Sequence, residues 1–513
     1  MKVPFTTADF LDRAELCYPE RTAVVDEPGA AQDGGLGTAT YRELGRRTRA
    51  LAAGLDALGV GRGERVAVVS HNSARLLETF FGVCSYGRVL VPINFRLAAA
   101  EVSFIVEHSG ATVLLIDPEL ADSLKDVTAR HTFLLGKQSD ESLLRFDVAP
   151  VPWEEPDEEA TATINYTSGT TARPKGVQIT HRNIWVNAVT FALHAGVTDR
   201  DVYLHTLPMF HANGWGMPYA MTGMGVPHIV IRKIDGADIL RRVQQHGVTV
   251  MCAAPAVVAA ILDAAAAWDG EIPGRGTVRV ICAGAPPPSR TIQRIEEELG
   301  WEFLQIYGLT ETSPLLTVNR RRAEEDGLAP AEAAKRLARA GMPALGVRIA
   351  ISEQGEVLAR SNVVLEGYWE QPEATADALE GGWFHTGDGG FLDEEGYVTI
   401  SDRRKDVIIT GGENVSSIEV EDCLFSHPAV SEVAVIGVPS EKWGETIKAL
   451  VVLSEGESAT EADLIAHCKQ HLAGYKSPTS VEFRGEIPRT ATGKIQKFKL
   501  REQYWAGYER QVN

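Results

Sequence analysis

The chain has 513 residues, of which 44% are hydrophobic and 23% are charged, and its formal net charge is −19. This length exceeds what a single hydrophobic core supports, so two or more domains are expected. The acidic balance excludes nucleic-acid binding through a basic surface, and the lack of a long apolar run excludes a membrane-spanning helix. Because the N-terminus lacks the apolar core of a signal peptide and the six cysteines include no Cys-x-x-Cys pair, we expect a cytoplasmic protein with reduced thiols.

Helical and extended patterns alternate along most of the chain. Thr40 and Glu43 have the spacing of a capping box, which predicts a helix that begins after Thr40. The glycine-rich stretch 59–63 precedes a strand, so it indicates a turn from helix to strand and not a dinucleotide-binding loop. Residues 331–340 are rich in alanine and charge, which predicts a solvated helix. Short, continuous apolar runs predict strands in α/β sheets that are covered on both faces. These runs are residues 65–70, 112–117, 162–166, 228–231, 248–253, 278–283 and 302–306.

Residues 166–176 form the most informative segment, with the sequence Tyr-Thr-Ser-Gly-Thr-Thr-Ala-Arg-Pro-Lys-Gly. A loop of hydroxyl residues and glycines after a strand can surround phosphate oxygens with backbone N–H groups, hydroxyls and the ammonium of Lys175. It is not a Walker loop, because Lys175 precedes the last glycine and no Ser or Thr follows the lysine. The segment therefore predicts a phosphate-binding loop of another kind.

A second group of polar residues follows the predicted strand 302–306. Tyr307, Thr310 and Glu311 bring an aromatic ring, a hydroxyl and a carboxylate to the carboxyl end of this strand, where open α/β sheets bind ligands. This set suits a stacked base, a phosphate contact and a Mg²⁺ ligand. Asp388 lies farther along the chain and adds a carboxylate that can accept hydrogen bonds from two vicinal hydroxyls.

The charged segment 402–406 interrupts a long globular stretch and indicates a domain boundary. After it, residues 432–438, 448–453 and 481–483 predict strands with helices between them. The last part of the chain is therefore predicted to be a small α+β domain.

The motifs at 166–176, 307–312, 386–388 and 488–494 closely resemble those of the adenylate-forming superfamily, which includes acyl-CoA synthetases, luciferases and peptide-synthetase adenylation domains. The resemblance covers nearly the whole chain and points most strongly to ligases for medium- and long-chain fatty acids. It implies a large N-terminal AMP-binding domain of several α/β subdomains, residues 1–402, and a small mobile α+β lid, residues 403–513, with its hinge near Lys405. It also implies ATP or AMP, Mg²⁺ and coenzyme A as ligands, and it allows a homodimer.

By the same resemblance, a few residues take part in the chemistry. Lys494, on the loop 488–494, bridges the incoming carboxylate and the α-phosphate while negative charge develops. Thr310 contacts the α-phosphate, Glu311 binds Mg²⁺, and His211 lies near the substrate carboxylate. The other implied contacts are Tyr307, Gly284, Ala285 and Pro286 for adenine, Asp388 and Arg403 for the ribose, Thr167, Ser168, Gly169, Thr170, Thr171 and Lys175 for the phosphates, and Gly411 and Gly412 for the pantetheine chain.

The segment 208–215 is rich in aromatic and soft side chains and resembles the part of fatty acyl-CoA synthetases that lines the acyl pocket. The resemblance assigns His211, Trp215 and Gly308 to this pocket, with Trp215 at the position that gates the acyl tunnel. We expect the substrate to be a hydrophobic monocarboxylic acid: a medium or long fatty acid, an aryl acid or a bulky polycyclic acid. The expected enzyme is an acyl-CoA ligase that converts acid, ATP and CoA into acyl-CoA, AMP and pyrophosphate.

Ala172 departs from the family pattern, which has glycine at this position of the phosphate loop. Alanine in a left-handed backbone conformation costs roughly 1–2 kcal/mol, so the substitution predicts slower adenylation. One alternative is therefore a family member that runs only the thioester step on an acyl-adenylate. Another is an adenylation enzyme that loads a carrier protein, which would share every motif. A luciferase-like oxygenase is a third, but it needs a special substrate that nothing in the sequence indicates.

Overall fold

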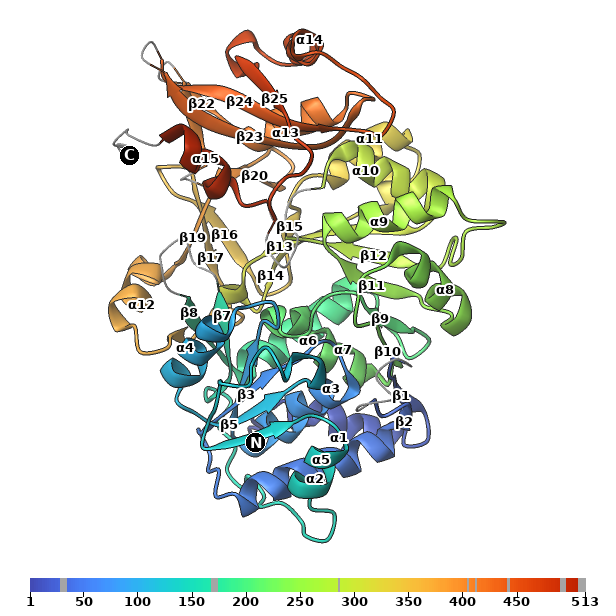
Figure 1. Cartoon of the computed structure of the whole chain (residues 1–513), viewed down its shortest axis with the longest axis vertical. Helices are drawn as coiled ribbons and strands as arrows, with labels where there is room; N and C mark the ends of the chain where they lie inside the picture. The colour runs from blue at the N-terminus through green and yellow to red at the C-terminus, as the bar shows by residue number, and fades with distance from the viewer. Residues whose placement is uncertain are drawn as a thin grey trace.

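The computed structural model of the chain describes residues 1–27, 35–167, 174–284, 287–403, 406–410, 413–440, 443–489 and 495–505, with the backbone alone at 402, 403 and 414. Within these residues the strands form four sheets. Figure 1 shows the N-terminal part in blue and green at the bottom and the small C-terminal unit in orange and red at the top.

A seven-stranded sheet lies in the N-terminal part. In β3 (Arg65–Val69), Val66 and Val68 pack on one face and Ala67 and Val69 on the other, so the strand is buried on both sides. The strand order is β18 (Gly367–Tyr368), β8 (Lys175–Thr180), β7 (Thr161–Thr167), β4 (Val89–Ile93), β3, β5 (Ala111–Ile116) and β6 (His131–Leu134). The helices in this region are α1 (Ala8–Cys17), α2 (Tyr41–Ala57), α3 (Ala74–Gly82), α4 (Ala99–Ser109) and α5 (Lys137–Leu143).

A nine-stranded sheet stands beside it (Figure 1). Its order is β15 (Met342–Pro343), β14 (Leu315–Arg320), β13 (Glu302–Gly308), β12 (Arg279–Cys282), β11 (Val250–Ala253), β9 (Tyr203–His205), β10 (His228–Val230), β1 (Thr22–Val25) and β2 (Thr38–Thr40). The helices are α6 (His181–Ala195), α7 (Met217–Met224), α8 (Gly236–His246), α9 (Pro255–Ala266), α10 (Ser289–Arg294) and α11 (Pro330–Leu337). In β11, Met251 packs with α8 to α11, whereas Cys252 packs with α6 and α7. Since α6 and α7 also contribute to the core of the seven-stranded sheet, they form a layer between the two sheets.

Two smaller units complete the chain. The first is the sheet of β16 (Arg348–Ile351), β17 (Glu356–Arg360), β19 (Phe384–Leu392) and β20 (Val398–Arg403), with α12 (Pro372–Ala378) before β19. The second is the C-terminal unit, whose sheet contains β21 (Ile408–Thr410), β22 (Glu413–Val415), β23 (Val430–Ser440), β24 (Gly444–Leu453) and β25 (Ser480–Phe483). Helices α13 (Ser417–Phe425) and α14 (Glu461–His471) pack on one face of this sheet and α15 (Lys497–Trp505) packs on the other.

The expected α/β class and the sheets covered on both faces are confirmed. The capping box is also present: the Glu43 amide donates to Thr40 Oγ1 at 3.2 Å, and the Thr40 amide donates to Glu43 Oε2 at 2.7 Å. The division of the chain at 402 and 403 remains a prediction, which the change of sheet between β20 and β21 supports.

The expectation of a solvated helix at 331–340 is wrong for one face of the helix. Ala333, Ala334 and Leu337 of α11 are buried, because this side of α11 joins the core around α10 and the nine-stranded sheet. All six cysteines are free thiols, and all except Cys17 are buried. Among the described helices, none combines the length and the apolar character that a membrane span requires.

Candidate active site

Strand β13 delivers the predicted nucleotide residues to one end of the nine-stranded sheet. It ends at Tyr307 and Gly308, and the short 3₁₀ turn of residues 310–312 follows with Thr310 and Glu311. The return strand β14 passes very close: a Cβ atom at Gly308 would lie 1.5 Å from the Pro314 carbonyl oxygen. Glycine at 308 is therefore required by backbone packing, whatever part it takes in a substrate pocket.

The predicted adenine and ribose residues are in contact. The Tyr307 hydroxyl donates to Asp388 Oδ2 at 2.8 Å, although the two residues are 81 positions apart. Asp388 is buried on β19, and the backbone of Arg403 is its direct partner on β20. Three of the predicted nucleoside contacts are thus brought together at the end of β13.

Glu311 is held by a tyrosine that the sequence analysis did not identify. The Tyr368 hydroxyl donates to Glu311 Oε1 at 3.0 Å, and the Leu365 amide donates to the Glu311 carbonyl at 2.7 Å. The Lys175 ammonium lies 4.6 Å from the centre of the Tyr368 ring, within the range of a cation–π contact. Burial, assisted by the charge of Glu311, raises the pKa of Tyr368 well above its usual value, so the phenol remains a donor at neutral pH. Its sequence signal is weak, since an aromatic residue after Gly367 is equally typical of an ordinary core strand.

The ends of the predicted phosphate loop are joined as a hairpin. Thr167 is the last residue of β7 and Lys175 the first of β8, and the two are antiparallel partners. Tyr368 lies on β18, which pairs with β8. This edge of the sheet therefore connects the end of the loop to Tyr368, the residue that donates a hydrogen bond to Glu311. The loop residues Ser168, Gly169, Thr170, Thr171 and Ala172 lie outside the described residues.

The predicted acyl-pocket segment contains a left-handed turn. Ala212, Asn213, Gly214 and Trp215 have φ values of 44°, 53°, 58° and 59° in succession, a conformation that is unfavourable for residues other than glycine. His211 is half-buried at the start of the turn, and Trp215 is only 4% exposed in the core between the nine-stranded sheet and α6 and α7.

Three buried asparagines, which sequence reasoning missed, hold this turn in place. Asn165 Nδ2 donates to Asn213 Oδ1 at 3.0 Å, and Asn213 Nδ2 donates to Thr163 Oγ1 at 2.9 Å. Asn187 Nδ2 donates to the Trp215 carbonyl at 3.2 Å. Because Thr163 and Asn165 belong to β7, the turn is fastened to the strand that leads into the phosphate loop.

Several predicted residues cannot be placed. Lys494, the hinge Lys405, Gly411, Gly412, Ala285 and Pro286 lie outside the described residues. The neighbours of Lys494 are described: a β-bridge between Arg489 and Ile495 closes the base of the segment that carries it. Gly284 lies just after β12 with φ of 96°, a conformation that favours glycine.

The C-terminal unit contacts the rest of the chain through α10 and α13. The Ser289 amide donates to Asp422 Oδ1 at 3.0 Å, so a carboxylate of the C-terminal unit meets the N-terminus of α10. The Arg290 guanidinium donates to the His427 carbonyl at 3.4 Å. Both contacts follow closely after Gly284, where the predicted adenine-edge segment begins.

The chain was then compared with known proteins. The family described as "AMP-binding enzyme" matches residues 11–369, and "AMP-binding enzyme C-terminal domain" matches residues 419–494. A 2-methylpropanoate–CoA ligase of Humulus lupulus is 37% identical over 97% of this chain and 95% of its own length. A 4-hydroxybutyrate–CoA ligase of Metallosphaera sedula is also 37% identical, over 96% of this chain and 93% of its own.

The structural comparison agrees with these matches. The solved structure of a Mycobacterium tuberculosis fatty acyl CoA synthetase superposes with a TM-score of 0.74 and 34% identity, and the match covers 98% of each chain. The two domain families match in order along the chain, and the relatives are matched over more than nine-tenths of their own length, so all three comparisons give the same assignment. The chain belongs to the family of AMP-binding, adenylate-forming enzymes and is an acid–thiol ligase of the acyl-CoA ligase type.

Proposed function

We propose that this ligase activates a short aliphatic monocarboxylic acid, without a second charged group, as its acyl-adenylate and then transfers the acyl group to CoA. The observation that carries the proposal is the joined arrangement of Tyr307 with Asp388 and of Glu311 with Tyr368 and Lys175 at the end of β13. It offers an aromatic ring, a carboxylate for ribose hydroxyls and a cation for phosphates within one continuous set of residues. In this proposal Thr310 contacts the α-phosphate and Arg403 assists Asp388 at the ribose.

Mg²⁺ is a hard cation that prefers carboxylate oxygens, and Glu311 fits this preference. Tyr368 and the Leu365 amide orient the residue, so its carboxylate is positioned before any ligand arrives. When bound, the ion would neutralise part of the negative charge on the phosphates.

The chemistry needs no covalent enzyme intermediate. A carboxylate oxygen of the acid attacks the α-phosphorus of ATP, a P–O bond forms, and the bond to pyrophosphate breaks. The CoA sulfur then attacks the acyl carbon, and the C–O bond to AMP breaks. Lys494 stabilises the charge that develops in the first step, and movement of the lid about Lys405 opens the path for the thiol through Gly411 and Gly412.

The proposed size of the acid follows from Trp215. Its side chain is buried and packs against the core at β13, so we place it as the end wall of the pocket that begins at His211. In the segment 207–216, His211 is the one residue that can carry a charge, which favours an acid without a second charged group. The relatives named for 2-methylpropanoate and 4-hydroxybutyrate support a small acid in place of a long fatty acid.

The test separates the two half-reactions. Acetate, butyrate, 2-methylpropanoate, octanoate and benzoate are each supplied with Mg·ATP, and pyrophosphate release is measured; each synthetic acyl-adenylate is then supplied with CoA, and thioester is measured. We expect the four-carbon acids to be the best substrates in the first assay. Lys494→Ala should lower adenylation by roughly 10²–10³, the size typical of one preorganised electrostatic contact, and should spare the thioester step.

Other outcomes would overturn the proposal in distinct ways. In one such outcome, the chain forms thioester from the acyl-adenylate but not from acid and ATP, and Ala172→Gly restores pyrophosphate release. This result would establish the alternative in which the protein is a family member with impaired adenylation. Transfer to a holo-carrier protein but not to CoA would establish the carrier-loading enzyme. Best activity with octanoate would refute the short-acid assignment while leaving the ligase intact.

Trp215→Ala tests the end wall. Removing the indole should raise kcat/KM for octanoate relative to butyrate and leave the KM for ATP nearly unchanged. Trp268→Ala, a partly buried tryptophan at the edge of another core cluster, is the matched control. An equal loss for all acids, with a lower melting temperature, would show that Trp215 only fills the core.

A further inference from the structure

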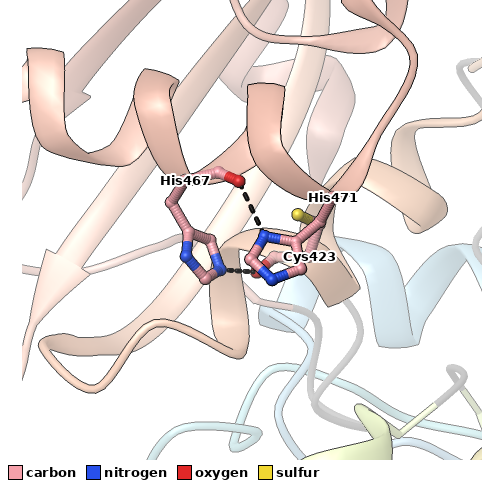
Figure 2. Close-up of side chains that lie close together, drawn as sticks. All are labelled: Cys423, His467 and His471. Carbon is pink, nitrogen blue, oxygen red and sulfur yellow. Dashed lines mark hydrogen bonds between the residues drawn. The ribbon is translucent and has the colours of Figure 1, made fainter.

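Two helices of the C-terminal unit bring a thiol and two imidazoles together, away from the candidate active site. Cys423 lies on α13, and His467 and His471 lie on α14, four residues apart and hence on one face of that helix. The Cys423 sulfur and one ring nitrogen of each histidine lie within 4.8 Å of one another. Figure 2 shows the two rings side by side, with the Cys423 side chain approaching from α13.

The hydrogen bonds of the cluster hold the donors in place. His471 Nδ1 donates to the His467 carbonyl at 2.8 Å, which orients the ring and leaves Nε2 with its lone pair. This is the arrangement by which a backbone carbonyl usually orients a metal-binding histidine. His467 Nε2 lies 3.0 Å from the Cys423 carbonyl oxygen and 2.8 Å from Ser426 Oγ, so metal binding through this nitrogen would replace these hydrogen bonds.

The cluster is also accessible. Cys423 is 9% exposed and His467 is half-buried, whereas His471 is exposed. The histidine nearest the surface thus gives solvent access to the cluster. The packed helices fix the other two donors.

We propose that Cys423, His467 and His471 form a binding site for a divalent cation of the Zn²⁺ class, with water or the Ser426 hydroxyl in the fourth position. A thiolate with two imidazoles is a donor set that Zn²⁺ prefers, and three protein ligands leave the fourth position open. Tetrahedral coordination places zinc ligands about 3.5 Å apart, so the three donors, which lie within 4.8 Å of one another, draw closer when the site closes.

The bound ion would link α13 to α14. Asp422, next to Cys423, makes the contact with Ser289 of the N-terminal part, so the cation braces the helix by which the C-terminal unit touches its neighbour. The site takes no part in adenylation or thioester formation, and the proposal stands independently of the acid assigned above.

The test uses the full chain, reduced and stripped of metal with a chelator. Zn²⁺ is titrated in competition with a chromophoric chelator, in the absence of ATP and Mg²⁺. We expect one tight equivalent per chain, which Cys423→Ser and His471→Gln each weaken by about 100-fold or more, since loss of a supporting residue alone typically costs about 10–100-fold. Cys17→Ser and His246→Gln, at a thiol and an imidazole outside the cluster, should bind as the parent does.

Co²⁺ provides the second readout. It should give a sulfur-to-cobalt charge-transfer band and the visible bands of a tetrahedral site, and these should disappear in Cys423→Ser and persist in Cys17→Ser. Circular dichroism checks that each variant is folded. If Cys423→Ser unfolds, the test rests on His471→Gln, because the His471 side chain is exposed and its replacement should not disturb the core. No tight equivalent, or binding that survives both cluster variants, would overturn the site and leave the cluster as a hydrogen-bonded contact between helices.

Discussion

At the scale of single residues, two tyrosines organise the candidate active site. Tyr307 and Tyr368 each donate to a carboxylate from a distant part of the chain, Asp388 and Glu311 respectively. These bonds keep two charged groups oriented, and preorganised groups stabilise developing charge without further rearrangement. If Glu311 binds Mg²⁺ as proposed, Tyr368 is a positioning residue, because it acts through Glu311.

Tyr368→Phe is predicted to lower adenylation without unfolding the protein. A hydrogen bond to a charged group contributes about 1.5–3 kcal/mol, so pyrophosphate release should fall by about 10–100-fold. The concentration of Mg²⁺ needed for half-maximal rate should rise, whereas the thioester step from synthetic acyl-adenylate should be nearly unchanged.

Tyr397→Phe is the matched control for this variant. Tyr397 is buried against the Arg339 guanidinium, in the same part of the chain but outside the cluster around Glu311. If Tyr368→Phe lowers both half-reactions equally, or leaves the Mg²⁺ dependence unchanged, Tyr368 has no positioning role.

At the scale of elements, the left-handed turn at 212–215 stores backbone strain next to the proposed acyl pocket. Residues held in such conformations persist only where the surroundings determine them, and they cluster at functional sites. Here the surroundings are the bonds of Asn165, Asn187 and Asn213. The turn therefore connects the proposed pocket wall at Trp215 to β7, the strand that leads into the predicted phosphate loop.

Asn213→Ala and Asn213→Gly separate the strain from the hydrogen bonds. Both substitutions remove the bonds to Asn165 and Thr163, but only alanine adds a Cβ penalty at positive φ. The free energy of unfolding of the alanine variant should therefore be lower than that of the glycine variant by about 1 kcal/mol. Both variants should raise the KM for the acid more than that for ATP. Equal stability, measured by chemical denaturation, would show that the turn is not under strain.

At the scale of the whole molecule, buried histidines make stability depend on pH. Burial lowers the pKa of His181 to about 4 and that of His228 to about 3, whereas a histidine in the unfolded chain titrates near 6.5. Above about pH 6.5 both groups are neutral in both states. Below about pH 6.5 the two histidines bind protons in the unfolded chain but stay neutral in the folded chain. The free energy of unfolding therefore falls as the pH falls.

The expected loss is up to about 1.4 kcal/mol per pH unit for each group, from about pH 6.5 down to the folded pKa. Melting temperature measured against pH should decline over this range, and His181→Asn should reduce the slope. A slope that is identical in His181→Asn and the parent would exclude His181 as a source of acid sensitivity.

The sequence by itself determined the class of fold, the family and those strands that are continuous apolar runs. Continuous apolar runs predicted strands that are buried on both faces, and both faces of β3 and of β11 are buried in the structure. The motifs resembled those of adenylate-forming ligases. The resemblance could be seen without any tertiary contact, because the pattern of glycines, hydroxyl residues and Lys175 lies within one short segment. Helix starts followed from short-range rules, as Thr40 and Glu43 show.

Only the tertiary structure decided which residues meet. Tyr368 reaches Glu311 across 57 positions, Asn187 reaches Trp215 across 28 positions, and Cys423 meets His467 across 44 positions. The buried face of α11 likewise depends on a neighbour, because alanine is compatible with both core and solvent. Periodicity and motifs record the needs of one segment, whereas these contacts arise from packing between segments, and no pattern within a single segment encodes its partner.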